Sequence, residues 1–390
     1  MQFGPPLQPG ISWRAVLPLE LGDKVLYGLH QSTSVRAMRR MGNDFNSILW
    51  LRYVMNPYEN LPEQHFWKTG VWAQKGDIGP RVQKTLTIPQ DARISTAGSC
   101  FAQNLAKHLL ARNPSNFHTT EALRDGDPVF SARFGNIYTA HQLLQLFQEA
   151  MGGAADGSCA IQRADGRYVD VFRPFVEPDG FDDADAVVAA RQVHLQAVKT
   201  MFLETNVFVF TLGLTETWQS TETDRVFPVA PGVYSVDAVA EFRNFELNEI
   251  QATMETFLDE LAKVNRDAQV LLTVSPVPLT ATYTQDHVLV ATMHSKSILR
   301  VVCSQVSAKY ANAFYFPSYE MISNPYSGES AYEPDNMRTI KSDHIARVMR
   351  FFEDNYLAQD HAAPASEARQ DLFEEDAFCD EVEIEKSVGF

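Results

Sequence analysis

Residues 98–100, Gly-Ser-Cys, are the part of the sequence whose residue types and order best suit chemistry. The apolar run Ile94–Ala97 precedes them, and from Phe101 onward apolar residues recur at the spacing of one helix face. This pattern predicts a strand, a glycine turn and a helix, with Ser99 and Cys100 standing exposed at the carboxyl edge of a sheet. A helix N-terminus stabilises a thiolate, so Cys100 is the candidate nucleophile and Ser99 a weaker one.

The same turn also has a purely structural interpretation. In that interpretation Cys100 is a small buried residue and the Ser99 side chain caps the following helix. The residues of the turn alone leave both interpretations open.

Polar residues at two further turns could complete a site. Thr215 and Glu216 follow the buried run 206–213, where Thr215 could donate to a developing oxyanion and Glu216 could orient a base or bind substrate hydroxyls. Gly135 and Asn136 could supply further hydrogen-bond donors.

A cysteine nucleophile usually needs a base, and the candidates lie late in the chain. They are His294 and His344, each of which could equally be structural or exposed. Asp343 is not expected to orient His344, because adjacent residues on a helix do not face each other. Lys296, close to His294, could bind an anionic group.

The elements that must position these residues alternate between strands and helices. Buried-type strands are predicted at 94–97, 206–213, 270–276 and 314–319, and helices at 184–203, 246–264, 288–310 and 343–356, with one more helix capped by Thr139. Such an alternation requires parallel strands and right-handed crossovers. We therefore expect a three-layer α/β domain. Residues 56–79 are expected to wrap it as a loop with Phe66, Trp67 and Trp72 packed beneath, and insertions are expected at 152–182, with a hairpin at 167–176, and at 226–235.

Composition excludes several classes of protein. The net charge of −16 argues against a general nucleic-acid binder, and no apolar run is long enough for a membrane span. No signal peptide is visible at the start of the sequence. The four cysteines are widely spaced, which fits a reducing cytoplasm and argues against a zinc ribbon. Neither H-x-x-H nor H-E-x-x-H occurs, so no metal and no cofactor is expected.

The two ends of the chain differ from its middle. Residues 1–55 are interpreted as an N-terminal extension, helical around Arg36, Arg39 and Arg40. Residues 360–390 hold ten acidic and two basic residues, so 358–390 is predicted to be a disordered acidic tail. Either end could contact a protein partner, the tail through Leu372, Phe373 and Phe378, although a merely solvating tail fits the composition better.

The segment Ala97–Gln103 resembles the signature of the GSCFA family. Six further segments resemble the family in the same order, namely Asn60–Trp67, Gly135–Thr139, Thr211–Trp218, Thr273–Pro278, Ser295–Arg300 and Tyr315–Glu320. The family looks like a branch of the SGNH (GDSL-like) hydrolases. The resemblance implies a flavodoxin-like parallel sheet over residues 56–357 and esterase or acyltransferase chemistry, often on carbohydrates or polysaccharide precursors.

The resemblance also implies roles for individual residues. The hydrolase pattern Gly-Asp-Ser places its nucleophile on Cys100, its second glycine on Gly135 and its oxyanion asparagine on Thr215. The expected Asp-x-x-His falls on Asp335–Arg338, where Arg338 replaces the histidine. An arginine cannot act as a base at neutral pH, so His344, His294 or Asp335 would have to handle protons, and Arg338 would bind a carboxylate or phosphate.

Two functions therefore follow from the sequence. The first is ester hydrolysis or acyl transfer through the nucleophile at the Gly-Ser-Cys turn, on a small molecule or glycan. The alternative is a catalytically inactive binding or scaffold protein on the same fold.

Overall fold

The computed structural model describes residues 56–78, 86–112, 114–124, 126–153, 155–235 and 239–358, together with Ile384, Lys386, Ser387 and Gly389. The chain divides into two units, residues 1–63 and 64–390. The expectations for the helical extension 1–55 and for the tail anchors Leu372, Phe373 and Phe378 lie outside the described residues.

The main sheet consists of four parallel strands in the order β1-β4-β8-β9. They are β1 (Ile94–Gly98), β4 (Val207–Leu212), β8 (Gln269–Val274) and β9 (Ala313–Tyr315). Phe117 forms a single parallel bridge with Ile94 on the outer side of β1. If the Phe117 bridge is counted as a rudimentary strand 2, then β1, β4, β8 and β9 are strands 1, 3, 4 and 5 in chain order. Their order across the sheet is 2-1-3-4-5, that of flavodoxin-like folds.

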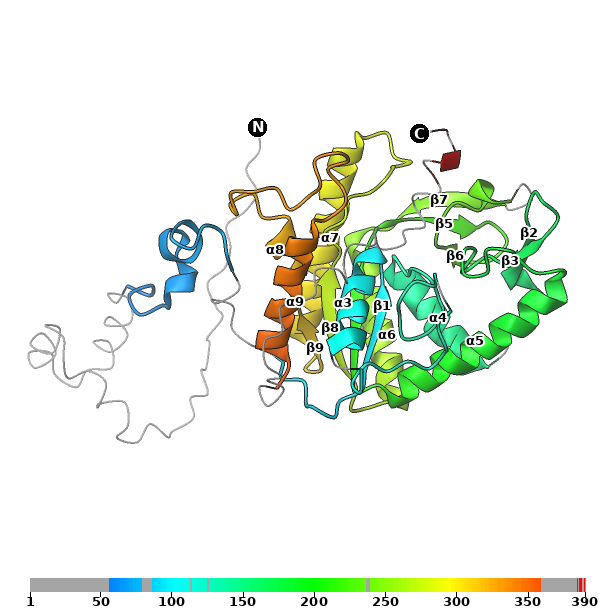
Figure 1. The fold of residues 1–390 in the computed structure, drawn as a ribbon, viewed down its shortest axis with the longest axis horizontal. Coiled ribbons are helices and arrows are strands. Elements are labelled where there is room, and N and C mark those ends of the chain that lie inside the picture. Colours follow the sequence, from blue (N-terminus) through cyan, green and yellow to red (C-terminus); the bar gives the residue numbers. More distant parts are fainter. Residues whose placement is uncertain are drawn as a thin grey trace, which may run out of the picture. The chain divides into compact units, whose positions relative to one another are not determined.

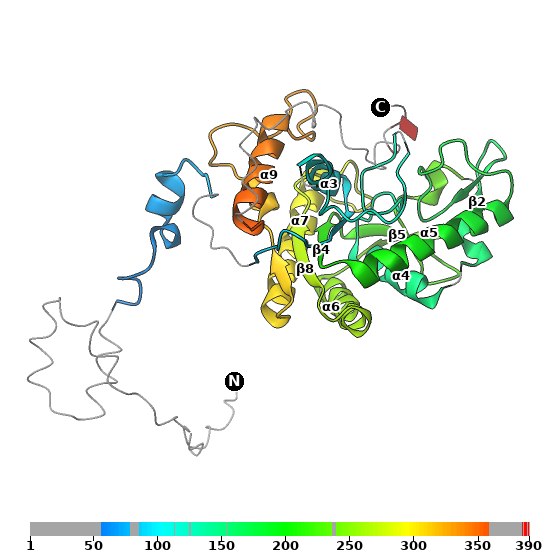
Figure 2. The same cartoon turned by 60° about the horizontal axis from the view of Figure 1, so that its bottom comes forward.

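Helices cover both faces of this sheet, so the three predicted layers are confirmed (Figure 2). One face carries α3 (Cys100–Arg112) and α9 (Ser342–Tyr356), which pack on Val207 and Val209 of β4. The other face carries α4 (Ala140–Gly152), α5 (Ala184–Glu204), α6 (Leu247–Val264) and α7 (Val288–Lys309). Alternate side chains of β4 therefore enter opposite hydrophobic cores, as in a strand buried on both faces.

Two insertions follow α4 and β4 (Figure 1). The first contains η5 (Gly157–Cys159), β2 (Ala160–Gln162) and β3 (Tyr168–Asp170). Because β2 pairs with β3, the hairpin lies at 160–170, and the prediction of a hairpin at 167–176 is wrong. The second insertion contains β5 (Glu216–Ser220), β6 (Val226–Phe227), η6 (Pro231–Val233) and β7 (Ala240–Asn244). Its strands form an antiparallel sheet of order β6-β5-β7, which the sequence did not predict.

The remaining short elements are η2 (Glu63–His65), η3 (Lys68–Trp72) and α8 (Ser318–Ile322). The prediction that the aromatic residues of 56–79 pack beneath a loop is wrong, because Trp67 is 62% and Trp72 71% exposed. Trp67 contacts Tyr326 edge to face, with ring centroids 4.9 Å apart. In the described part of the chain, no helix has the length and apolar character needed to cross a bilayer.

Candidate functional site

The candidate site lies at the carboxyl ends of β1 and β4. After β1 the chain first pairs on one side of this strand, at the Phe117 bridge. It later adds β4 on the opposite side of β1. The order of the strands therefore reverses between β1 and β4. Open α/β sheets bind their ligands in the crevice at such a switch point.

Gly98 allows the turn between β1 and α3 to approach β4 closely. Its φ is +142°, and a Cβ at this position would lie 2.5 Å from the carbonyl oxygen of Thr211. The same carbonyl accepts a hydrogen bond from the Ser99 backbone N–H at 3.1 Å. Only glycine fits here, and the fit fixes where Cys100 begins α3.

Ser99 and Cys100 are both buried. Among the described residues the Ser99 hydroxyl has no hydrogen-bond partner, so the interpretation of its side chain as a helix cap is wrong. Its backbone carbonyl instead accepts from Ala102 N–H at 2.8 Å. The prediction of an exposed thiol is also wrong, because only 5% of Cys100 is exposed. A substrate that reaches the sulfur must therefore enter a nearly closed site.

The loop that carries Gly135 and Asn136 closes the site on one side. Gly135 adopts φ +72°, and the Ile137 N–H donates to the carbonyl of Gly98 at 2.8 Å. The Asn136 side-chain carbonyl accepts from the Gln103 amide of α3 at 3.0 Å. This bond directs the Asn136 carbonyl oxygen toward α3 and fixes the orientation of its amide group.

The end of β4 closes the site on another side. The N–H groups of Gly213 and Leu214 both donate to the carbonyl of Tyr138. Thr215 is fully buried, its N–H donates to Ser295 Oγ at 3.1 Å, and its hydroxyl donates to Asn244 Oδ1 at 2.7 Å. Because a hydroxyl has one proton, Thr215 could serve an oxyanion only by exchanging its bond to Asn244.

Lys296 and Glu216 place opposite charges at this edge. The Lys296 ammonium is buried and donates to the carbonyl of Gly213 at 2.7 Å. Glu216 accepts from the Thr282 hydroxyl at 2.7 Å and from the Tyr283 N–H at 3.2 Å. Burial raises the pKa of Glu216 above its ordinary value, while these hydrogen bonds and the nearby His294 act in the opposite direction. His294 itself is exposed on α7.

The remaining predicted residues lie beyond β8. Arg338 is half-buried and its Nε donates to the carbonyl of Pro278 at 3.2 Å, whereas Asp335 is exposed on the same loop. His344 is buried in the first turn of α9, and burial lowers its pKa below the ordinary value. The structure thus brings Cys100, Asn136, Thr215 and Lys296 to one edge through shared contacts, while Asp335 lies on the surface. Within the described residues, no group of three His, Cys, Asp or Glu side chains is placed to hold a metal ion.

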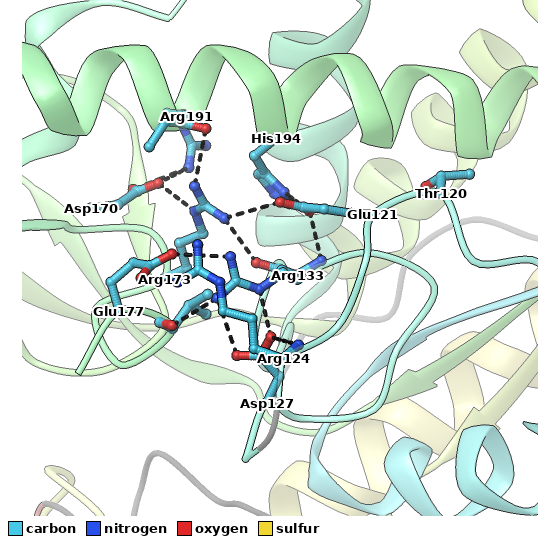
Figure 3. A network of polar contacts seen from close by, with 12 residues as sticks. Thr120, Glu121, Arg124, Asp127, Arg133, Asp170, Arg173, Glu177, Arg191 and His194 are labelled. Atoms are coloured by element: carbon cyan, nitrogen blue, oxygen red, sulfur yellow. Dashed lines mark hydrogen bonds and ion pairs between the residues drawn. The ribbon is translucent and has the colours of Figure 1, made fainter. Parts of the chain in front are cut away.

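Sequence reasoning missed a buried network of arginines and carboxylates beside this edge (Figure 3). Arg191 bonds both Asp170 and Glu149, and Arg173 bonds Asp170 and the backbone carbonyl of Arg133. Burial is the largest influence on the Asp170 pKa and opposes ionisation, but Arg191 and Arg173 outweigh it and lower that pKa to about 2. Because Arg173 bonds the backbone of Arg133, the network fixes the position of the chain two residues before Gly135.

The strand order defines a three-layer α/β protein of the flavodoxin-like class. Its switch point carries a glycine turn and a buried cysteine at the start of the next helix. The model of the GSCFA family matches residues 93–352, about two thirds of the chain, and the protein belongs to this family. The comparison with curated proteins and the comparison with solved structures each gave no match.

Proposed function

We propose that this protein hydrolyses esters or transfers acyl groups through a thioester on Cys100, as an SGNH-like member of the GSCFA family. The observation that supports this proposal most directly is that Cys100 is the first residue of α3 at the switch point, with the Gly135–Asn136 loop bonded to the same turn. The resemblance to SGNH hydrolases further favours a saccharide or its precursor as substrate. The widely spaced cysteines favour the cytoplasm as the place of action.

In the proposed reaction the Cys100 thiolate forms a bond to the acyl carbon, and the carbonyl π electrons move onto oxygen. Backbone N–H groups at the start of α3 and the Asn136 amide hold this oxyanion. The intermediate then expels an alkoxide, which takes up a proton. Water or an acceptor hydroxyl attacks the thioester, gives up its proton and releases the thiolate.

The charges at the edge support this chemistry. The helix dipole of α3 and the buried Lys296 ammonium both favour a negative charge on sulfur and on the oxyanion. His294, which interacts electrostatically with Glu216, is the proposed proton carrier, with His344 and Asp335 as the other candidates. Arg338 would bind an anionic group of the substrate.

The test is incubation with p-nitrophenyl acetate followed by intact-mass measurement and peptide mapping. We expect one acetyl group on Cys100 and turnover that falls to background in Cys100→Ala. Cys159→Ala is the matched control, because Cys159 is buried beside β2. An absence of adduct together with unchanged turnover in Cys100→Ala would remove the proposal.

A second candidate function is ligand binding without chemistry, which the burial of Cys100 and the arginine at position 338 favour. Lys296 and Arg338 each donate to a backbone carbonyl at the same sheet edge, which suits a carboxylate or phosphate ligand. In that case Cys100→Ala would leave ligand binding unchanged, whereas Arg338→Ala would weaken it.

A further inference from the structure

Three aromatic rings gather on one face of the antiparallel sheet. Trp218 of β5 lies opposite Phe242 of β7 in the strand register, with ring centroids 5.9 Å apart. Tyr283, from the loop between β8 and α7, contacts both rings, at 4.9 Å from Trp218 and 5.3 Å from Phe242. The ring planes are inclined to one another by 49–66°, so the rings form no parallel stack. All three line a pocket of about 140 Å³.

A carboxylate belongs to the same pocket. Glu216 lies two residues before Trp218 in β5, and residues so spaced point to the same face of a strand. Its two oxygens accept from the Thr282 hydroxyl at 2.7 Å and from the Tyr283 N–H at 3.2 Å, which fixes the carboxylate beside the rings. Among the described residues neither a lysine nor an arginine pairs with it, while His294 lies close enough to act on its charge. The negative charge of Glu216 is therefore available to a ligand.

Both features favour a positive charge inside the pocket. The face of an aromatic ring is electron-rich and attracts a cation, most strongly in the case of tryptophan. Burial makes the ionised carboxylate costly and raises the pKa of Glu216, and a cation in the pocket offsets this cost. The rest of the wall is largely aliphatic, with Val229, Val233 and Leu279 among its members. Such a wall suits a cation that carries methyl groups better than a strongly hydrated primary ammonium.

We propose that this pocket binds a quaternary ammonium group, with its methyl groups against the three rings and Glu216 as its counter-charge. The volume lies below the roughly 300–1,000 Å³ of sites for drug-sized ligands, so the pocket holds a small head group.

The pocket also adjoins the candidate site. Leu214 and Glu216, which flank Thr215 in the chain, both line it. A ligand whose ammonium group is held here therefore lies next to the end of β4. The inference concerns binding alone and does not depend on any reaction at Cys100.

The test is calorimetric titration of the full-length chain with choline and with two analogues. The first analogue, 3,3-dimethyl-1-butanol, has the shape of choline but a carbon atom in place of the nitrogen and no charge. We expect choline to bind at least about tenfold more tightly, because the ring faces and Glu216 attract the charge. The second analogue, ethanolamine, keeps the charge without the methyl groups and should bind more weakly than choline.

Three outcomes of these titrations would overturn the proposal. In the first, choline does not bind. In the second, the uncharged analogue binds as tightly as choline, and the pocket is then merely apolar. In the third, ethanolamine binds as tightly as choline, and a carboxylate alone then suffices.

Variants assign the binding to this pocket. Trp218→Leu keeps an apolar wall but removes one ring face, and we expect the affinity for choline to fall about 3- to 30-fold. Glu216→Gln removes the charge and should weaken binding by a similar factor. Trp72→Leu and Glu222→Gln are the matched controls, because both residues are exposed and neither lines the pocket. Unchanged affinity in Glu216→Gln would overturn the proposal even if Trp218→Leu failed to fold.

Discussion

The ammonium group of Lys296 lies 2.7 Å from the carbonyl oxygen of Gly213, at the end of β4. Gly213 in turn touches the turn that carries Cys100, because a Cβ at Gly213 would lie 3.0 Å from the Ser99 Cβ. Lys296 of α7 thus places a buried positive charge on Gly213, which packs against Ser99, the residue that precedes Cys100.

The first prediction concerns this charge. Lys296→Met keeps most of the side-chain volume but removes the cation, which leaves less thiolate on Cys100 at a given pH. We expect alkylation of Cys100 by iodoacetamide to slow roughly 3- to 30-fold, because the sulfur loses one favourable charge of the same sheet edge at intermediate dielectric. Peptide mapping over time measures the rate. Lys309→Met removes an exposed charge from the same helix and should leave the rate unaltered.

The second prediction concerns the turn itself. Gly98→Ala would place a methyl group 2.5 Å from Thr211 O in a backbone conformation that only glycine adopts readily. We expect a loss of about 3 kcal/mol or more in the free energy of unfolding, or failure to fold. Gly152→Ala is the control, because no atom of the described residues lies within 4 Å of the added atom at the end of α4. Equal denaturation midpoints for the two variants would contradict the assigned turn geometry.

The main sheet could be predicted because its strands are continuous apolar runs between helices with clear periodicity. The predicted Thr139 cap is confirmed, and it forms a complete capping box with Gln142. The antiparallel sheet could not be predicted, because β5 (Glu-Thr-Trp-Gln-Ser) and β7 (Ala-Glu-Phe-Arg-Asn) are mostly polar. Such strands form through pairing with one another, and no local pattern encodes that pairing.

In the candidate site too, local features could be predicted from the sequence and contacts between distant segments could not. The turns at Gly98, Gly135 and Gly213 were visible in the sequence because each follows or interrupts a recognisable local pattern. Their partners were not, because the pairs Gln103 with Asn136 and Asn244 with Thr215 join distant segments. Charged residues of the insertion at 152–182, such as Asp170 and Arg173, look solvated in the sequence, and only their pairing offsets the cost of burying them.

The third prediction tests that pairing. Arg191 is 2% exposed and bonds both Asp170 and Glu149. Arg191→Met would leave the buried Asp170 and the largely buried Glu149 short of a partner, and we expect the free energy of unfolding to fall by about 3–5 kcal/mol. Lys309→Met breaks the exposed pair with Glu255 and should cost only about 0–1 kcal/mol. Urea denaturation of both variants measures the difference, and similar losses would argue against a buried network.

The last prediction concerns pH. His194 is fully buried with Nδ1 2.7 Å from Glu121, and burial, aided by the nearby Arg173 and Arg191, lowers the His194 pKa from 6.5 to about 4. Between these pH values the unfolded chain binds more protons than the folded chain, so stability falls as pH drops through this window. The size of this contribution is on the order of 3 kcal/mol.

His194→Gln can still donate to Glu121 but does not titrate. We expect this variant to lose part of its stability at pH 7 and to show a flatter decline between pH 6.5 and 4, measured by urea denaturation at each pH. Burial raises the pKa of Glu121, but the hydrogen bond from His194 helps to lower it to about 2. Glu121 therefore contributes a separate loss of stability below pH 4.5, in the unaltered chain and in the variant. An undiminished slope above pH 4.5 in His194→Gln would assign the acid sensitivity to other groups.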